Sequence, residues 1–153
     1  MNFPVEFCER MKSLLKNEYN DFLTAFSSEN ESNAIRINTK KELIEQEFGK
    51  LESVPWCDCG FYADKSKISG NHPYHLAGLF YFQEASAMCA GEALPVNEGD
   101  FILDLCAAPG GKSTHIAQKL SGTGLLVSNE INKKRAGILS ENIERMGFKN
   151  VIV

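Results

Sequence analysis

Long apolar runs are missing from this 153-residue sequence, and no hydrophobic stretch approaches the roughly 20 residues of a membrane-spanning helix. The first residues include Glu6 and Glu9 and lack the apolar segment of a secretory signal. Internal repeats and low-complexity tracts are also not visible. The sequence therefore predicts neither a membrane protein nor an exported or repetitive one.

Cysteine is too sparse for a disulfide scaffold, since there are five cysteines, an odd number. Reduced thiols and a cytoplasmic location are the simplest interpretation. Cys57 and Cys59, with His72 and His75, are four possible zinc ligands, but both pairs are spaced more tightly than structural zinc sites usually are. We therefore predict no metal site.

An excess of positive charge is missing as well, because 16 Lys and Arg face 20 Asp and Glu, for a net charge of −4. This balance gives no basic footprint for RNA. The clusters Lys40–Lys41 and Lys133–Arg135 are interpreted as solvated helix faces. If the protein binds RNA, most of the positive surface is expected beyond Val153. With 43% hydrophobic residues, the composition fits a soluble mixed α/β protein.

The most informative feature that is present is the run Phe101–Thr114, FILDLCAAPGGKST. Its apolar first part predicts a buried strand that ends near Asp104, and its Pro-Gly-Gly turn leads directly into a helix. Small residues in such a turn let backbone amides approach a ligand closely. The pattern predicts a nucleotide-like cofactor site beyond the carboxyl end of a parallel sheet.

The spacing of small residues in this run discriminates between cofactors. A phosphate-binding P-loop would need glycine where Cys106 stands, and a dinucleotide fingerprint finds only Gly110 and Gly111. The methyltransferase pattern Asp-x-Gly-x-Gly-x-Gly instead meets a small residue at every place after Asp104, namely Cys106, Ala108 and Gly110. The sequence therefore favours S-adenosylmethionine.

A second acid supports this interpretation. Glu130 follows the apolar segment Leu125–Asn129 and lies 26 residues after Asp104 (130 − 104), which suits one strand–helix–strand unit. An acid there can accept hydrogen bonds from both hydroxyls of a cofactor ribose. The alternative is that Glu130 only caps the next helix, where the dipole favours a carboxylate. Arg135 is a further candidate for the same pocket.

Patterns elsewhere predict a small helix-rich α+β amino-terminal domain, residues 1–75 with its connector, followed by residues 76–153 of a methyltransferase domain. The region from Pro4 to Phe26 is helical in spacing, and Ala34–Asn38 alternates like a half-buried strand. The segment 56–78 is interpreted as an irregular connector. The expected helices are Lys41–Phe48, Glu84–Leu94, Lys112–Leu120 and Lys133–Met146, and the expected core strands are Phe101–Cys106, Leu125–Asn129 and Val151–Val153.

These motifs together resemble one family. The segments Asp104–Lys112, Tyr81–Met88 and His72–Gly78 are similar to the RNA cytosine-5 methyltransferases of the NOL1/NOP2/Sun family, in particular the bacterial ribosomal RNA branch. The resemblance implies an S-adenosylmethionine-dependent, Rossmann-like α/β fold and an amino-terminal unit that helps to hold RNA. The expected cofactor-binding residues are Cys106, Ala107, Ala108, Pro109, Gly110, Gly111, Lys112, Glu130 and Arg135.

The resemblance also implies methylation of carbon 5 of a cytosine in ribosomal RNA. In the family the catalytic cysteines lie in later motifs, so we expect no catalytic residue before Val153. Cys106 is interpreted as a small lining residue, because it occupies a glycine-like position. With only the first three core strands, the chain is expected to be an amino-terminal fragment that is inactive alone and self-associates through an unpaired sheet edge.

Two other functions stay open at this point. An RNA ribose 2′-O-methyltransferase can also carry Ala-Pro-Gly-Gly after its first strand, although an aromatic residue normally stands at the position of Lys112. A non-catalytic remnant that binds cofactor or RNA is the other alternative. We expect RNA, in the first place ribosomal RNA, as the partner, and no membrane.

Overall fold

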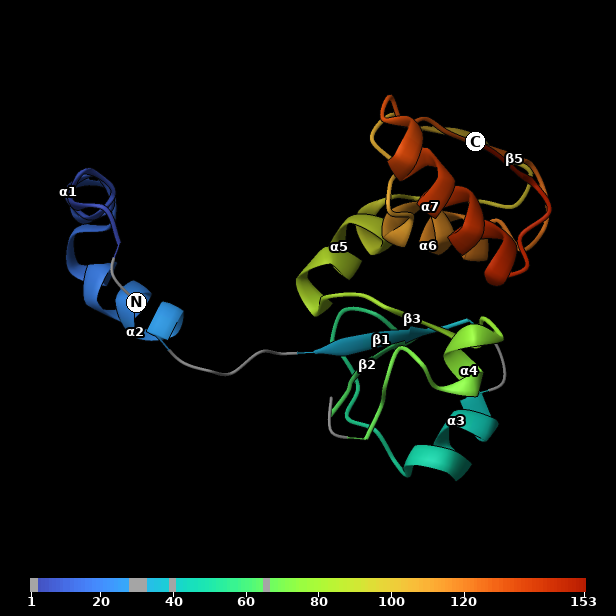
Figure 1. Ribbon diagram of the computed structural model, residues 1–153, viewed down its shortest axis with the longest axis horizontal. Coiled ribbons are helices and arrows are strands. Elements are labelled where there is room, and N and C mark those ends of the chain that lie inside the picture. The colour runs from blue at the N-terminus through green and yellow to red at the C-terminus, as the bar shows by residue number, and fades with distance from the viewer. Residues whose placement is uncertain (1–2, 28–32, 39–40, 65–66) are drawn as a thin grey trace. The chain divides into compact units, whose positions relative to one another are not determined.

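The computed structural model describes residues 3–27, 33–38, 41–64 and 67–153, and they form two compact units, residues 1–31 and 32–153 (Figure 1). The first unit contains helix α1 (Val5–Leu15), the short 3₁₀ helix η1 (Lys16–Glu18) and helix α2 (Tyr19–Ser27). Aromatic rings join the helices, with Phe7 and Phe22 6.3 Å apart between centroids. The helical region expected from Pro4 to Phe26 is confirmed, as two α-helices joined by the 3₁₀ helix.

An antiparallel sheet begins the second unit. Its strands are β1 (Ala34–Ile37), β2 (Gly60–Tyr62) and β3 (Phe80–Phe82), in the order β2-β1-β3. All four residues of the central strand β1 are buried, so the expectation of a half-buried strand is wrong. The alternating pattern predicted that one face of this strand lies in solvent. That face is buried because a second layer covers it.

Helices α3 (Lys41–Phe48) and α4 (Pro73–Leu76) accompany this sheet, and α3 confirms the expected helix. The segment interpreted as an irregular connector contains β2 and α4, and β3 was not expected from the sequence. Because β3 pairs with β1, the antiparallel sheet extends past the expected domain boundary at residue 75. By compactness, the structure divides the chain into residues 1–31 and 32–153.

A parallel sheet forms the rest of the second unit, in the order β4-β5-β6. The strands of this sheet are β4 (Phe101–Asp104), β5 (Leu125–Ser128) and β6 (Val151–Ile152). The helices of this region are α5 (Ala85–Ala93), α6 (Gly111–Lys119) and α7 (Lys133–Arg145). Each agrees with an expected element to within about two residues, which is the usual uncertainty of such boundaries. The incomplete Rossmann-like α/β fold is thereby confirmed.

Helix α6 lies between the two sheets (Figure 1). On one side Ile116, Ala117 and Leu120 pack with Leu126 of the parallel sheet. On the other side Gln118 donates from Nε2 to the carbonyl of Ile37 on β1, at 2.9 Å. One helix therefore contacts both sheets, by apolar packing on one side and by a hydrogen bond on the other.

The carboxyl end of α7 fixes a second contact with the antiparallel region. Arg145 donates from Nη1 to the carbonyl oxygens of His75 (2.6 Å) and Phe80 (3.3 Å). Gly78, at φ 74°, lies so close that a Cβ there would be 1.9 Å from the Arg145 carbonyl oxygen. Only glycine permits this approach, so the loop before β3 is held tightly to α7.

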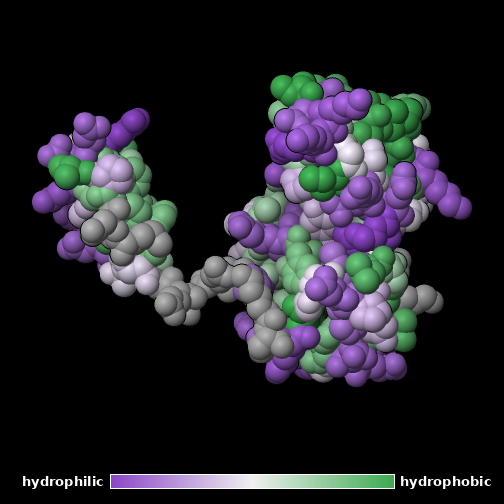
Figure 2. All heavy atoms as spheres, viewed as in Figure 1, coloured by the Kyte–Doolittle hydropathy of each residue, from purple (hydrophilic) through white to green (hydrophobic). Residues whose placement is uncertain are grey.

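The outer strand β4 carries an apolar, exposed face. Phe101 and Leu103 on the strand, and Leu105 directly after it, are 83%, 57% and 65% exposed. In the described part of the chain β4 pairs with β5 alone. Figure 2 shows apolar surface gathering at the end of the second unit that bears this sheet. Within the described ranges, none of the helices combines the length and apolar character that crossing a membrane requires.

Candidate cofactor site

The loop between β4 and α6 is organised around Asp104. Its Oδ1 accepts a hydrogen bond from the backbone N–H of Cys106 (3.2 Å), and its Oδ2 accepts one from the hydroxyl of Ser113 (2.7 Å). The strand-end acid thus ties both ends of the loop together. This contact explains physically why a carboxylate is useful at this position.

Gly110 is the N-cap of α6 and has φ 113°, a conformation that favours glycine. A Cβ at this position would also lie 3.1 Å from Leu139 Cδ1 on α7. The preceding Ala108–Pro109 peptide bond is cis. Pro109 and Gly110 therefore form the turn that leads from the end of β4 into α6.

Two of the loop amides already donate within the protein. Cys106 N–H donates to Asp104, and Ala107 N–H donates to the carbonyl of Asn129 at 3.0 Å. The amides of the first turn of α6, which begins at Gly111, have no carbonyl within the helix to reach. A helix start of this kind suits the carboxylate of a ligand. The donors best placed for a ligand are therefore those that follow Pro109.

A pocket of about 340 Å³ opens beside this loop. It is lined by residues 81–84 and Ala87 on one side and by residues 106–109, Gly111 and Lys112 on the other. Tyr81 Oη lies 3.5 Å from the carbonyl oxygen of Pro109. Tyr81 and Gln83 were not among the expected site residues, although the Tyr81–Met88 motif that contains them carried part of the resemblance.

Glu130 lies after β5, and its side chain is only 6% exposed. Its Oε1 accepts from the backbone N–H of Asn132 (2.9 Å), and its Oε2 is 3.4 Å from Arg135 Nη1. The cap of α7 is Asn132, whose Oδ1 accepts from the amides of Lys134 and Arg135. Glu130 is therefore not the helix cap, and its carboxylate retains acceptor capacity.

Arg135 contacts both candidate segments. The guanidinium that pairs with Glu130 also donates from Nη2 to the carbonyl of Ala108, at 2.7 Å. Asn142, further along α7, donates to the carbonyl of Pro109 at 2.8 Å. Helix α7 thus holds the glycine-rich loop and the acidic residue in one arrangement.

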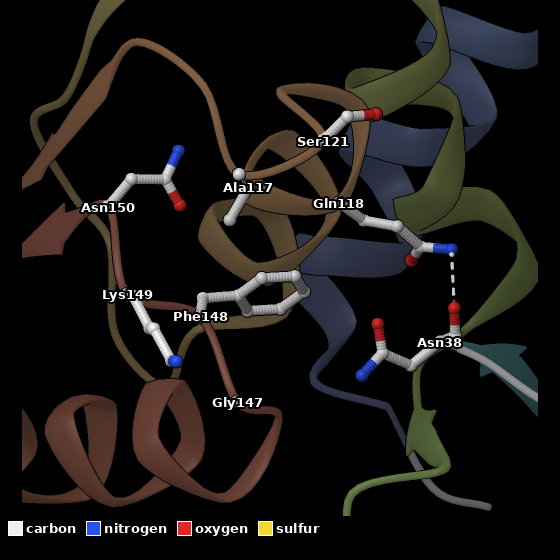
Figure 3. Close-up of a pocket in the computed structure, with 9 residues that line it drawn as sticks. Asn38, Ala117, Gln118, Ser121, Gly147, Phe148, Lys149 and Asn150 are labelled. Atoms are coloured by element: carbon white, nitrogen blue, oxygen red, sulfur yellow. Dashed lines mark hydrogen bonds between the residues drawn. The ribbon is translucent and has the colours of Figure 1, made fainter.

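A different pocket, of about 330 Å³, lies at the other end of α6 (Figure 3). Asn38, Gln118, Phe148 and Asn150 are among its lining residues, and Gln118 Nε2 donates to the Asn38 carbonyl at 3.4 Å. Asn150 immediately precedes β6, so this pocket is next to the amino end of a strand. Ligands of open α/β sheets bind at the carboxyl ends, so we assign no cofactor to it.

The two histidines considered as zinc ligands with Cys57 and Cys59 have other contacts. His72 accepts from the amide of Tyr74 through Nδ1 (3.1 Å) and its Nε2 lies 3.5 Å from Glu47. His75 Nδ1 lies 2.7 Å from the carbonyl of Gly70. Both residues support the local structure around α4.

A parallel sheet with a glycine-rich turn after one strand and a buried acid after the next defines a Rossmann-like methyltransferase domain. Comparison with known families agrees: residues 3–85 match the N-terminal domain of 16S rRNA methyltransferase RsmF, and residues 92–153 match 16S rRNA methyltransferase RsmB/F. The first of these matches spans more than half of the chain, so the chain belongs to the family of 16S rRNA methyltransferase RsmF.

Curated relatives resemble nearly the whole chain. "Ribosomal RNA small subunit methyltransferase F" of Vibrio vulnificus is 41% identical over 96% of the chain, and the protein of the same name from Pectobacterium carotovorum is 38% identical over 97%. In both cases the match covers 34% of the relative. The chain therefore spans about a third of the length of these proteins.

Solved structures confirm the fold. A methyltransferase homologue from Pyrococcus horikoshii superposes with a TM-score of 0.84 at 29% identity, covering 99% of this chain and 52% of that one. NSun6 from the same organism, solved with SFG, superposes with a TM-score of 0.87 at 23% identity, covering 99% of this chain and 65% of the other.

Proposed function

We propose that the full-length protein transfers a methyl group from S-adenosylmethionine to carbon 5 of a cytosine in ribosomal RNA of the small subunit. Family membership and the names of the relatives support this substrate. We also propose that residues 1–75 help to hold the RNA, that residues 76–153 supply the amino-terminal part of the cofactor-binding domain, and that the protein acts in the cytoplasm.

The observation that carries the proposal is the double contact of Arg135. One guanidinium contacts Glu130 and the Ala108 carbonyl, so the two predicted cofactor-binding segments lie within one side chain of each other. In this proposal the turn holds the methionine end of the cofactor and Glu130 accepts from the ribose hydroxyls. Arg135 then acts as a positioning residue. The NSun6 structure was solved with SFG, an analogue of S-adenosylmethionine, which supports the choice of cofactor.

The individual contacts to the cofactor follow from this placement. The amides of Gly110, Gly111 and Lys112, at the start of α6, are aimed at the cofactor carboxylate. Cys106, Ala107, Ala108 and Pro109 form the wall of the same pocket. The bound cofactor supplies an activated methyl group on a sulfonium. The side chain of Cys106 then lines the pocket and takes no part in bond formation.

The chemistry at the base needs a nucleophile. A thiolate that adds to carbon 6 of cytosine makes carbon 5 electron-rich, so that carbon 5 could take the methyl group from the sulfonium, whose remainder would leave as a neutral thioether. A base would then remove the carbon 5 proton so that the thiolate can leave. We propose that the parts of the protein outside this chain provide the thiol. Cys106 is exposed in the chain and belongs to the cofactor loop.

Bisulfite sequencing of ribosomal RNA from a deletion strain tests the function. One cytosine of the small-subunit RNA should lose its protection, and the full-length gene should restore it. The Cys106→Ala gene should restore it too, because the residue is a lining one. If protection is unchanged but one ribose becomes sensitive to alkaline cleavage, the ribose 2′-O-methyltransferase alternative is correct. If neither changes, the non-catalytic alternative is favoured.

A further inference from the structure

Four side chains with metal-binding atoms converge away from the cofactor loop. They are Cys57 and Cys59, in the turns before β2, Glu92 on α5 and His115 on α6. Their ligand atoms all lie within 4.8 Å of one another. The residues come from three separate segments, so the cluster is a product of the tertiary fold.

The turns before β2 explain how so short a spacing works. Cys57 N–H donates to the Val54 carbonyl (3.1 Å), and Gly60 N–H donates to the Cys57 carbonyl (2.9 Å). These two successive turns point both thiols to the same side, with the sulfur atoms 3.6 Å apart. The spacing of one residue, which argued against zinc in the sequence, is thus compatible with a shared ligand.

The distances fit a tetrahedral zinc ion. Typical zinc bond lengths give about 3.8 Å between two sulfurs, about 3.6 Å between sulfur and imidazole nitrogen, and about 3.3 Å between nitrogen and carboxylate oxygen. The cluster has 3.6 Å between the sulfurs, 4.0 Å from Cys59 Sγ to His115 Nε2, and 3.1 Å from that nitrogen to Glu92 Oε1. The remaining pairs of ligand atoms lie within 4.8 Å of each other, so side-chain shifts of up to about 1 Å would complete the tetrahedral geometry.

The surroundings are built closely around these groups. His115 is 1% exposed, and its ring rests against Gly91, where a Cβ would lie 2.3 Å from Nδ1. A Cβ at Gly60 would lie 3.1 Å from Cys57 Sγ. Within the described residues His115 Nδ1 has no hydrogen-bond partner. The imidazole is therefore oriented by what Nε2 contacts, which is the cluster.

Charge around the cluster stays within one unit of neutral when a divalent ion is present, counting the nearby cations Arg36 and Lys119. Two thiolates, one carboxylate and Zn²⁺ sum to −1, and the buried guanidinium of Arg36 adds +1. Burial lowers the pKa of Arg36 to about 10, so it stays charged at neutral pH. Lys119 Nζ, 3.7 Å from Glu92 Oε2, lies at the more exposed side of the cluster. Glu92, 31% exposed, provides a route for the ion to enter.

We propose that Cys57, Cys59, Glu92 and His115 bind one zinc ion that fastens the turns before β2 to helices α5 and α6. Two soft sulfurs with an imidazole and a carboxylate suit zinc, and four protein ligands make a closed, structural site. The site stands independently of the proposed methyl transfer, since none of its four ligands lines the pocket beside the cofactor loop.

Metal analysis of the full-length protein, purified without chelators, tests the site. We expect about one zinc per chain, as for a closed structural site. The Cys57→Ser and Cys59→Ser variants should lose it, whereas Cys89→Ser, which removes an exposed cysteine of α5, should keep it. Replacement by cobalt should produce thiolate-to-metal charge-transfer absorption and the intense visible bands of tetrahedral cobalt.

The cobalt spectrum of the unaltered protein keeps the test decisive even if the cysteine variants fail to fold. Absence of thiolate absorption, with zinc no higher than in Cys59→Ser, would overturn the proposal. A Cys57–Cys59 disulfide, detected by mass spectrometry of the freshly purified protein, would overturn it too. Zinc that is retained when Cys57 and Cys59 are replaced would show that the ion is bound elsewhere, and the assignment would fail.

Discussion

Arg36, in the middle of β1, donates from Nη2 to the hydroxyl oxygen of Thr114 on α6 at 2.5 Å. Thr114 in turn donates to the carbonyl of Gly110 at 2.7 Å, so this contact leads from the antiparallel sheet to the cofactor loop. Arg36 also donates from Nε to Gln83 (3.0 Å) and from Nη1 to Gln118. A guanidinium with no exposure is tolerated because these acceptors satisfy it.

Replacing Arg36 by methionine should destabilise the protein severely. The change leaves the buried acceptors of Gln83, Gln118 and Thr114 without their donor, and breaking such a buried network costs about 3 kcal/mol. The loss of stability is measured as a lower midpoint of urea unfolding. The matched variant Arg10→Met, at an exposed arginine of α1, should leave the midpoint almost unchanged. Equal midpoints in the two variants would contradict this role.

Replacing Glu130 by alanine should weaken cofactor binding. The variant loses two charge-assisted hydrogen bonds to the ribose, worth roughly 2–4 kcal/mol. Calorimetry with the full-length protein measures the affinity, and Glu141→Ala, an exposed glutamate on α7, serves as the control. Unchanged affinity in Glu130→Ala would remove the ribose assignment.

Replacing Gly110 by alanine should disturb the loop more than a positive φ alone explains. Gly110 has φ 113° and a Cβ there would lie 3.1 Å from Leu139, whereas Gly122 has φ 77° with nothing within 4 Å of a Cβ. Both alanine variants carry backbone strain of about 1–3 kcal/mol, and only Gly110→Ala adds the contact. We expect Gly110→Ala to be less stable than Gly122→Ala and to bind the cofactor more weakly. Equal losses in both would show that the contact with Leu139 is unimportant.

The 153-residue chain on its own should self-associate and should not transfer methyl groups. Strand β4 exposes Phe101 and Leu103, and an unpaired apolar edge favours pairing with another chain. Sedimentation should show oligomers that grow with concentration, and Leu103→Lys should reduce them because edge charges oppose pairing. A monomer at all concentrations, or incorporation of labelled methyl into RNA, would contradict this prediction.

Sequence alone determined the parts of the protein that are encoded locally. The run from Phe101 to Thr114 contains the strand, the turn and the start of the helix within 14 residues, so period and glycine placement were sufficient to predict β4, the loop and α6. Local patterns were likewise sufficient to predict strand β5 and helix α7. The prediction for β1 was wrong. The alternating pattern of Ala34–Ile37 indicated a half-buried strand, but a second layer covers its other face, so all four residues are buried.

Only the tertiary structure decided which distant side chains meet. Arg36 finds partners 47 to 82 residues away, and Cys59 meets His115 across 56 residues. Nothing local to Glu92 or His115 marks them as neighbours of Cys57, because their approach depends on how α5 and α6 pack against the sheet. In the sequence, the histidines nearest to Cys57 and Cys59 are His72 and His75. In the fold, the two cysteines instead lie beside His115. A metal site depends on which side chains are close in space, and the sequence alone does not give that proximity.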